Sequence, residues 1–236
     1  MPVPQPTGEV GRKLVVRYTN VNGIRSKIEE VKKWMEEGKA DVVALVETMA
    51  DTATVDCSFC DLLRLNRLGC RKESGGGVAL AVKKDIQIIR MYELEVAGLE
   101  VLWVKVIALR MNLLLGAIYA PVYDDDVFSK LRTSMERIPP YLRRNIVLVR
   151  VFNCPKLNWS RDAGGASEKE RDLLSLQKEF RLWQKVKECT RQRGSSSSSL
   201  DLVFSSQVSL VRGVRIIKPP AATWLTTMAY DSASRP

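Results

Sequence analysis

The first fifty residues contain two different hydrophobic periods. Residues 14–20 are rich in β-branched and aromatic side chains and end before the turn signal Asn22-Gly23, so they predict a strand. Residues 42–47 predict a buried strand, and the segment between the two strands is amphipathic and ends at Gly38. The pattern therefore predicts a strand–helix–strand unit. In the helical segment, apolar residues recur at Ile24, Ile28, Val31, Trp34 and Met35.

The rest of the chain continues this alternation of strands and helices. Further strands are expected at residues 77–83, 99–107, 112–121, 145–153, 200–204 and 214–218, and helices at 126–138 and 168–190. Two strand-like runs meet at residues 110–112, which predicts an antiparallel hairpin and hence a mixed sheet. Residues 195–199 are all serine and are expected to form a flexible loop. The pattern predicts one α/β domain.

Composition favours a single folded domain over residues 14–236, after a flexible leader at 1–13. The 236 residues are 45% hydrophobic and 27% charged, which is ordinary for a globular protein. Residues 111–123 form the longest uncharged stretch near the middle, shorter than the roughly twenty residues that span a bilayer, so no membrane partner is expected. The N-terminus lacks the basic start and apolar run of a secretory signal, and five cysteines are an odd number for a disulfide framework. We therefore expect an intracellular protein that is not secreted.

The net charge of +10 is concentrated in the second half of the chain. Residues 1–126 carry 17 Lys and Arg against 18 Asp and Glu, whereas residues 127–236 carry 20 against 9. Such an excess attracts a polyanion such as a nucleic acid through its phosphates. A solvated basic helix face would give the same composition, so charge alone does not choose between the two interpretations.

Polar residues close four of the expected strands. Asn20, Glu47, Tyr119 and Asn153 each follow an apolar run at its last position. In α/β sheets the carboxyl ends of strands gather around a shared crevice. A carboxylate, two amides and a phenol at such a place suit a hard metal ion and a phosphate oxygen. Strands also end in polar residues simply where they meet solvent, and position alone leaves this alternative open.

Six short motifs follow one another along the chain. They are Asn20-Val-Asn22-Gly23-Ile-Arg, Val46-Glu47-Thr48, Gly75-Gly-Gly77-Val-Ala-Leu-Ala-Val, Gly116-Ala-Ile-Tyr119-Ala-Pro121, Val149-Arg150-Val151-Phe152-Asn153-Cys154-Pro155 with Trp159, and Ser199-Leu-Asp201-Leu-Val-Phe-Ser-Ser206. In order and spacing these motifs resemble those of the endonuclease/exonuclease/phosphatase superfamily, and the last two are most similar to the endonuclease domain of non-LTR retrotransposons of the LINE, jockey-like type. The resemblance implies a four-layer α/β sandwich with two mixed β-sheets flanked by helices. It also implies a divalent metal, Mg²⁺ or Mn²⁺, and hydrolysis of a DNA phosphodiester bond, a nick that primes reverse transcription.

The resemblance assigns metal and phosphate roles to five residues. Glu47 matches the metal-binding glutamate, a ligand type that a hard cation prefers. Asn20 and Asn22 match the asparagine motif that shapes the metal and phosphate site, and Tyr119 matches the tyrosine that hydrogen-bonds the scissile phosphate. Asp231 matches the aspartate of the closing Ser-Asp-His motif and is expected to join Glu47 at the metal.

Two further residues match groups that assist the reaction, one by stabilising charge and one by orienting a histidine. Asn153 matches the asparagine that steadies charge as the phosphorus becomes five-coordinate, which is a role for a preorganised donor. Asp201 matches the aspartate that orients a catalytic histidine in the superfamily.

Two positions depart from the superfamily pattern. Arg150-Val151 stands where Gly-Asp is expected, which removes the carboxylate that handles the proton of the attacking water or leaving group. Tyr230-Asp231-Ser232 stands where Ser-Asp-His is expected, and the chain contains no histidine. A positioned acid–base group typically contributes about 10²–10⁴-fold, so little turnover is expected. Asp201 is left as an orienting residue without a partner.

Three functions remain compatible with these residues. The first is a catalytically impaired retrotransposon endonuclease domain, which binds DNA through basic residues of 127–236. Such a domain would be nuclear or cytoplasmic, and its reverse-transcriptase domain would lie in a longer parent chain. The second is a working nuclease with a displaced acid or a metal-bound water in place of the lost groups. The third is a nucleic-acid-binding module without chemistry. Arg150 either pairs with an acid such as Glu47 or contacts a phosphate, and the sequence does not choose.

Overall fold

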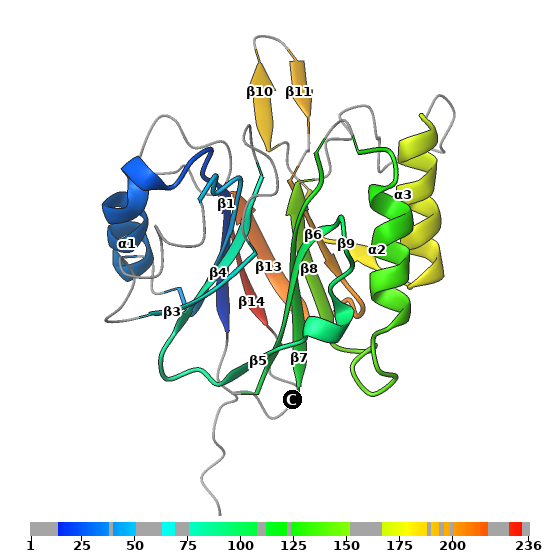
Figure 1. Cartoon of the computed structure of the whole chain (residues 1–236), viewed down its shortest axis with the longest axis horizontal. Helices are drawn as coiled ribbons and strands as arrows, with labels where there is room; N and C mark the ends of the chain where they lie inside the picture. The colour runs from blue at the N-terminus through cyan, green and yellow to red at the C-terminus, as the bar shows by residue number, and fades with distance from the viewer. Residues whose placement is uncertain are drawn as a thin grey trace, which may run out of the picture.

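Two six-stranded β-sheets pack face to face, and helices cover their outer surfaces (Figure 1). This arrangement confirms the four-layer α/β sandwich expected from the sequence. In the part of the chain that is described, no helix is both long and apolar enough to cross a membrane. The computed structural model describes residues 14–37, 40–50, 63–68, 76–107, 112–121, 124–151, 167–187, 190–193, 196–198, 201–216 and 227–232.

The first sheet is built around a parallel strand pair. β1 (Val15–Asn20) and β2 (Val42–Val46) run parallel, and the 3₁₀ turn η1 (Arg25–Lys27) with helix α1 (Ile28–Glu37) makes the crossover between them. The order across the sheet is β13-β14-β1-β2-β4-β3. The other strands run antiparallel to their neighbours and are β3 (Leu63–Leu68), β4 (Val78–Lys83), β13 (Val211–Ile216) and β14 (Thr227–Ser232).

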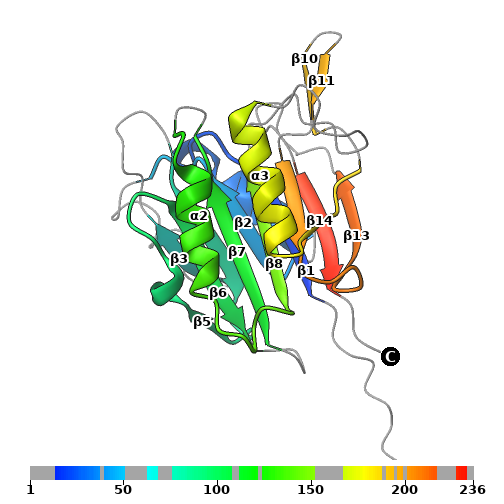
Figure 2. The same ribbon diagram turned by 90° about the vertical axis from the view of Figure 1, so that its right-hand side faces the viewer.

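The second sheet repeats this plan. β7 (Leu113–Tyr119) and β8 (Ile146–Val151) run parallel, with helix α2 (Val127–Glu136) in the crossover. The order is β5-β6-β7-β8-β12-β9, and helix α3 (Glu168–Glu179) lies beside α2 on the outer face (Figure 2). The antiparallel strands are β5 (Ile88–Arg90), β6 (Glu100–Val106), β9 (Trp183–Gln184) and β12 (Asp201–Ser205), with the 3₁₀ turn η2 (Tyr92–Leu94) between β5 and β6.

A separate two-stranded hairpin projects beyond both sheets. It consists of β10 (Arg191–Arg193) and β11 (Ser196–Ser198), and it stands clear of the sandwich in both views (Figures 1 and 2). The expectation of a flexible loop at 195–199 is therefore wrong for residues 196–198. A run of serine has no strand-like hydrophobic pattern, and the pairing with β10 is what makes this segment a strand.

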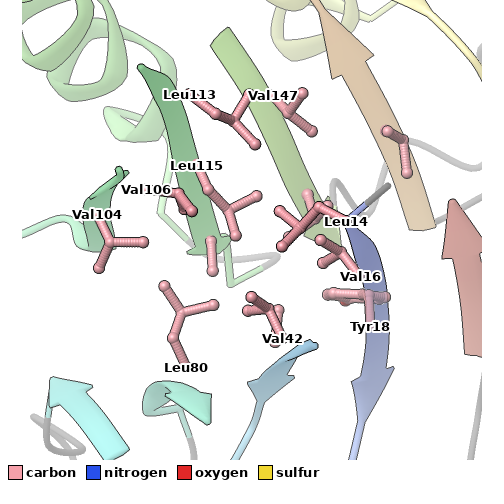
Figure 3. Close-up of a cluster of buried hydrophobic side chains, with 14 of the residues drawn as sticks. Leu14, Val16, Tyr18, Val42, Leu80, Val104, Val106, Leu113, Leu115 and Val147 are labelled. Carbon is pink, nitrogen blue, oxygen red and sulfur yellow. The ribbon is translucent and has the colours of Figure 1, made fainter. Parts of the chain in front are cut away.

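Alternation within the strands divides the core into three apolar layers. In β2, Val42, Ala44 and Val46 face the other sheet, whereas Val43 and Leu45 pack on the side of α1. The layer between the sheets is filled by side chains of both sheets (Figure 3). A third layer fills the space between the second sheet and its helices; it includes Trp103, Leu114, Ile118, Phe128, Leu131, Leu173 and Leu176.

The helix expected at 168–190 is correct only in its first half. It begins with a capping box in which Ser167 accepts from the backbone N–H of Glu170 and the Glu170 carboxylate accepts from the N–H of Ser167. The helix ends at Glu179, and Arg181 then adopts a left-handed φ of 51°. The chain continues as β9, whose pairing with β12 overrides the helical spacing of the apolar residues.

Gly116 provides a test of how tightly the second sheet packs on its helices. A Cβ at Gly116 would lie 2.5 Å from the Trp103 ring and 2.7 Å from Leu148 Cδ1. Both neighbours are fully buried, so neither has room to move. We expect Gly116→Ala to lower the free energy of unfolding by about 1–3 kcal/mol through overpacking, measured by urea denaturation. The matched control is Gly213→Ala in β13, where a Cβ meets nothing within 4 Å; equal losses in both variants would contradict the tight packing.

Candidate active site at one edge of the two sheets

One register row in the second sheet gathers polar residues at a single edge. Glu100 pairs with Tyr119, Tyr119 with Val151, and Val151 with Asp201, so the row crosses β6, β7, β8 and β12. Tyr119 packs against the apolar layer between the sheets, and Asp201 is only 4% exposed. The row therefore closes the end of that layer with a carboxylate on each side and a phenol between them.

The facing edge of the first sheet is formed by Asn20 and Glu47. Asn20 is the last residue of β1 and pairs with Val46, so Glu47 follows immediately on the neighbouring strand. Asn20 shares the strand face of Val16 and Tyr18, which point into the layer between the sheets. It is 4% exposed, whereas Glu47 is half-buried.

Two hydrogen bonds join these edges across the sandwich. The Tyr18 hydroxyl donates to Asp201 Oδ1 at 3.2 Å, and both residues are buried. The backbone N–H of Gly77, directly before β4, donates to Glu100 Oε2 at 2.6 Å. Because each bond links one sheet to the other, the rows ending in Asn20 and in Asp201 lie at the same edge of the molecule.

Two loops with left-handed backbone support Asn20 and Glu47. Among the described residues, Asn22, Glu47 and Met49 have φ of 43°, 53° and 48°, and Arg181 is the only other non-glycine residue with positive φ. The backbone N–H of Asn22 donates to Asn20 Oδ1 at 3.0 Å, and the N–H of Gly23 donates to Glu47 O at 2.8 Å. Backbone of this kind is costly for residues other than glycine and is often found at functional sites.

The Glu47 carboxylate is suited to bind a metal ion. Its carboxylate makes no hydrogen bond or ion pair with any other described residue, although the chain carries a net charge of +10. Mg²⁺ and Mn²⁺ prefer oxygen ligands, and Mg²⁺ commonly binds one or two carboxylates while keeping several waters. No cluster of three or more Asp, Glu, Cys or His suited to a metal occurs among the described residues. Glu47, which directly follows the register partner of Asn20, would therefore hold such an ion largely through water.

Comparison with solved structures identifies the architecture. The structure is similar to the endonuclease domain of TRAS1, a telomere-specific non-LTR retrotransposon, with a TM-score of 0.73 and 13% identity over 94% of this chain and 98% of that one. It is also similar to the AP endonuclease LMAP of Leishmania major, with a TM-score of 0.72 and 14% identity over 95% of this chain and 89% of that one. The protein has the endonuclease/exonuclease/phosphatase fold.

A third solved structure has a similar fold. The 3'-5' exonuclease NExo of Neisseria meningitidis gives a TM-score of 0.68 with 14% identity, over 93% of this chain and 99% of that one. No protein-family model and no curated protein matches the sequence. At these identities the likeness establishes the endonuclease/exonuclease/phosphatase fold alone, and the role of each residue has to be argued from its position.

The fold places most of the expected site residues together. Asn20, Asn22 and Glu47 lie on the two adjoining loops of the first sheet, and Tyr119 and Asp201 lie on the facing row of the second. Tyr119 and Asp201 are separated by one intervening strand, and two strand spacings are roughly 10 Å. Asn153 lies outside the described residues, and for Arg150 and Val151 the structure describes the backbone.

Asp231 does not belong to this edge. β14 runs antiparallel to β1, and Asp231 pairs with Val15, at the far end of the strand from Asn20. Five strand residues correspond to roughly 16 Å, so the prediction that Asp231 joins Glu47 at the metal is wrong. Ser232 lies beyond Asp231 at the same far end, whereas Thr227, the first residue of β14, pairs with Thr19 beside the candidate site.

Asp201 has no histidine to orient, because the chain contains none, and a tyrosine hydroxyl contacts its carboxylate instead. Its side chain accepts from the Tyr18 hydroxyl, and its backbone N–H donates to Thr190 Oγ1 at 3.1 Å. Sequence reasoning missed Tyr18, because its position inside an apolar strand is typical of core. It missed Glu100 as well, because polar residues were sought where strands end and Glu100 begins one.

The Tyr18–Asp201 contact can be tested by a double-mutant cycle. We expect Tyr18→Phe to lower the free energy of unfolding by about 1.5–3 kcal/mol, because hydrogen bonds to charged groups contribute this much and both groups are buried. Urea denaturation of Tyr18→Phe, Asp201→Asn and the double variant measures the coupling. Tyr92→Phe is the control, because Tyr92 is 66% exposed. Additive losses in the cycle would show that the two side chains are not coupled.

Proposed function

We propose that this protein is the endonuclease domain of a non-LTR retrotransposon, a metal-dependent DNA phosphodiesterase whose turnover is impaired. The observation that carries the proposal is the edge itself: Glu47, whose carboxylate has no hydrogen bond or ion pair among the described residues, lies at the same edge as a row in which position 151, between Tyr119 and Asp201, is valine. The likeness to the TRAS1 endonuclease domain supports the retrotransposon assignment. The proposal places a reverse-transcriptase domain in a longer parent chain and the site of action on nuclear DNA.

The residues of the edge would divide the work between binding and charge stabilisation. Glu47 and Asn20 would hold Mg²⁺ or Mn²⁺, and the ion would supply the positive charge that a phosphodiester needs as negative charge develops on its oxygens. Tyr119 would donate its hydroxyl hydrogen to a phosphate oxygen, and the Asn153 amide would do the same at the five-coordinate stage. Proton transfer would be the weak step, because valine cannot accept a proton and the chain contains no histidine.

A carboxylate at position 151 should restore proton transfer. We expect Val151→Asp to raise magnesium-dependent nicking of supercoiled plasmid by about 10²-fold, the lower end of what a positioned acid–base group contributes. Val151→Asn is the matched control, since it adds a polar group of similar size that cannot carry the proton. Adding Glu47→Gln to Val151→Asp should abolish the gain. Nicking by the natural chain at the rate of Val151→Asp would instead establish a working nuclease that moves its protons through other groups.

A second candidate, nucleic-acid binding without chemistry, is supported by the projecting hairpin. β10 carries Arg191 and Arg193, whose register partners on β11 are serines. The hairpin begins directly after Thr190, which accepts the hydrogen bond from the Asp201 backbone at the candidate site. Two cations on an arm next to the phosphodiester site suit contact with the DNA backbone on either side of it.

The two arginines of the β10–β11 hairpin should contribute to the salt dependence of DNA binding. A plot of log affinity for duplex DNA against log salt concentration has a slope of about −0.9 for each phosphate neutralised. We expect Arg191→Ala/Arg193→Ala to make this slope less negative by about 1.8, measured by fluorescence anisotropy. Lys32→Ala/Lys33→Ala on α1 removes the same charge from the outer layer and should leave the slope within about 0.5 of the natural value. The same slope change in both variants would mean that the arm acts only through net charge.

A further inference from the structure

Lys27 occupies an unusual position beside the Asn20 loop. It is the last residue of η1 and is half-buried. Its ammonium donates to Val21 O at 2.5 Å and to Asn22 O at 3.1 Å. No ion pair joins Lys27 to Glu47, although both side chains belong to the described part of the site. The Lys27 charge is therefore turned toward backbone carbonyls and leaves the glutamate available to a cation.

Two sets of partners bind most of the backbone of this loop. Two of its N–H groups donate to the end of β2: Val21 N donates to Val46 O at 3.0 Å, and Gly23 N donates to Glu47 O at 2.8 Å. Its carbonyls at Val21 and Asn22 turn the other way and accept from Lys27. One ammonium thus satisfies two carbonyls that have no other donor among the described residues, and leaving such groups unpaired is costly.

The same ammonium holds the strained backbone of the loop in place. Asn22 has a left-handed φ of 43°, a conformation that is disfavoured unless the surroundings fix it. Lys27 fixes the carbonyls on both sides of the Asn22 Cα, and the Asn20 side chain fixes the Asn22 N–H. If the loop relaxed, the Gly23 N–H would leave the Glu47 carbonyl, and Glu47 would lose a support of its own left-handed conformation.

We propose that Lys27 is the positioning residue of this site: through the Val21 and Asn22 carbonyls it fixes Asn20, Asn22 and Glu47 in the arrangement that binds a divalent cation. The inference rests on the proposed function only in taking a divalent cation as the ligand of Glu47. Groups that orient a metal ligand without touching the metal commonly change its affinity by about 10–100-fold.

The test compares Lys27→Met, Lys27→Arg and Lys32→Met in the whole chain. Mn²⁺ affinity is measured by electron paramagnetic resonance, and hydrogen exchange is followed at the Val21, Gly23 and Ile24 amides. Lys27→Met should weaken Mn²⁺ binding at least about tenfold and speed exchange at these amides. Lys27→Arg keeps a cationic donor and should recover most of the affinity. Lys32→Met, which removes a half-buried lysine paired with Glu29 on α1, should change neither readout.

The outcomes separate this inference from the proposed function. Faster exchange with unchanged Mn²⁺ affinity in Lys27→Met would overturn the positioning role and leave Lys27 as a brace of the loop alone. Unchanged exchange would overturn the inference altogether. If the natural chain binds no Mn²⁺ while Lys27→Met still loosens the loop, the metal-dependent function fails and Lys27 keeps its role in fixing Asn20 and Asn22. If Lys27→Met does not fold, Lys27→Arg and Lys27→Gln supply the same comparison, with the larger losses expected for glutamine.

Discussion

The packing of the two six-stranded sheets against each other places every described side chain of the candidate site. Each strand that reaches the edge alternates between the layer shared by the sheets and an outer layer under the helices. Tyr18 and Asn20 share the inner face of β1, and Asp201 shares the inner face of β12 with Val203. Where the apolar layer ends, the next inward positions are polar, and the Tyr18–Asp201 and Gly77–Glu100 hydrogen bonds close it. A shift of one residue in either register would turn these groups outward, so the site and the core depend on the same alignment.

Local sequence was sufficient for some features because their causes are local. The strand–helix–strand unit around α1 follows from hydrophobic period, and Asn20 and Glu47 follow from the position at which two buried runs end. Other features depend on pairing that no local pattern encodes. β9 interrupts a helical spacing because it pairs with β12, and β11 forms from serines because β10 lies beside it. Motif resemblance alone predicts Asp231 at the metal, and only the antiparallel register of β14 shows that it lies at the opposite end of β1 from Asn20.

The basic excess of the second half is partly used inside the molecule. Lys169 donates to the carbonyls of Pro121 and Asp124 in the loop that follows Tyr119, much as Lys27 does in the loop that follows Asn20. Lys185 donates to Val208 O at 2.9 Å, and its pKa is lowered by burial and further by repulsion from Lys187. Net charge therefore overstates the number of cations that a nucleic acid can meet, and the location of each cation decides more than the total.

The left-handed residues at the edge lower the stability of the fold. Glycine would relieve the backbone strain at Glu47 or at Met49, and strain of this kind costs on the order of 1 kcal/mol or more at each position. Neither position is glycine, so this part of the sequence is not the one that stability alone would favour. At Glu47 a glycine would also remove the carboxylate on which the proposed metal site depends.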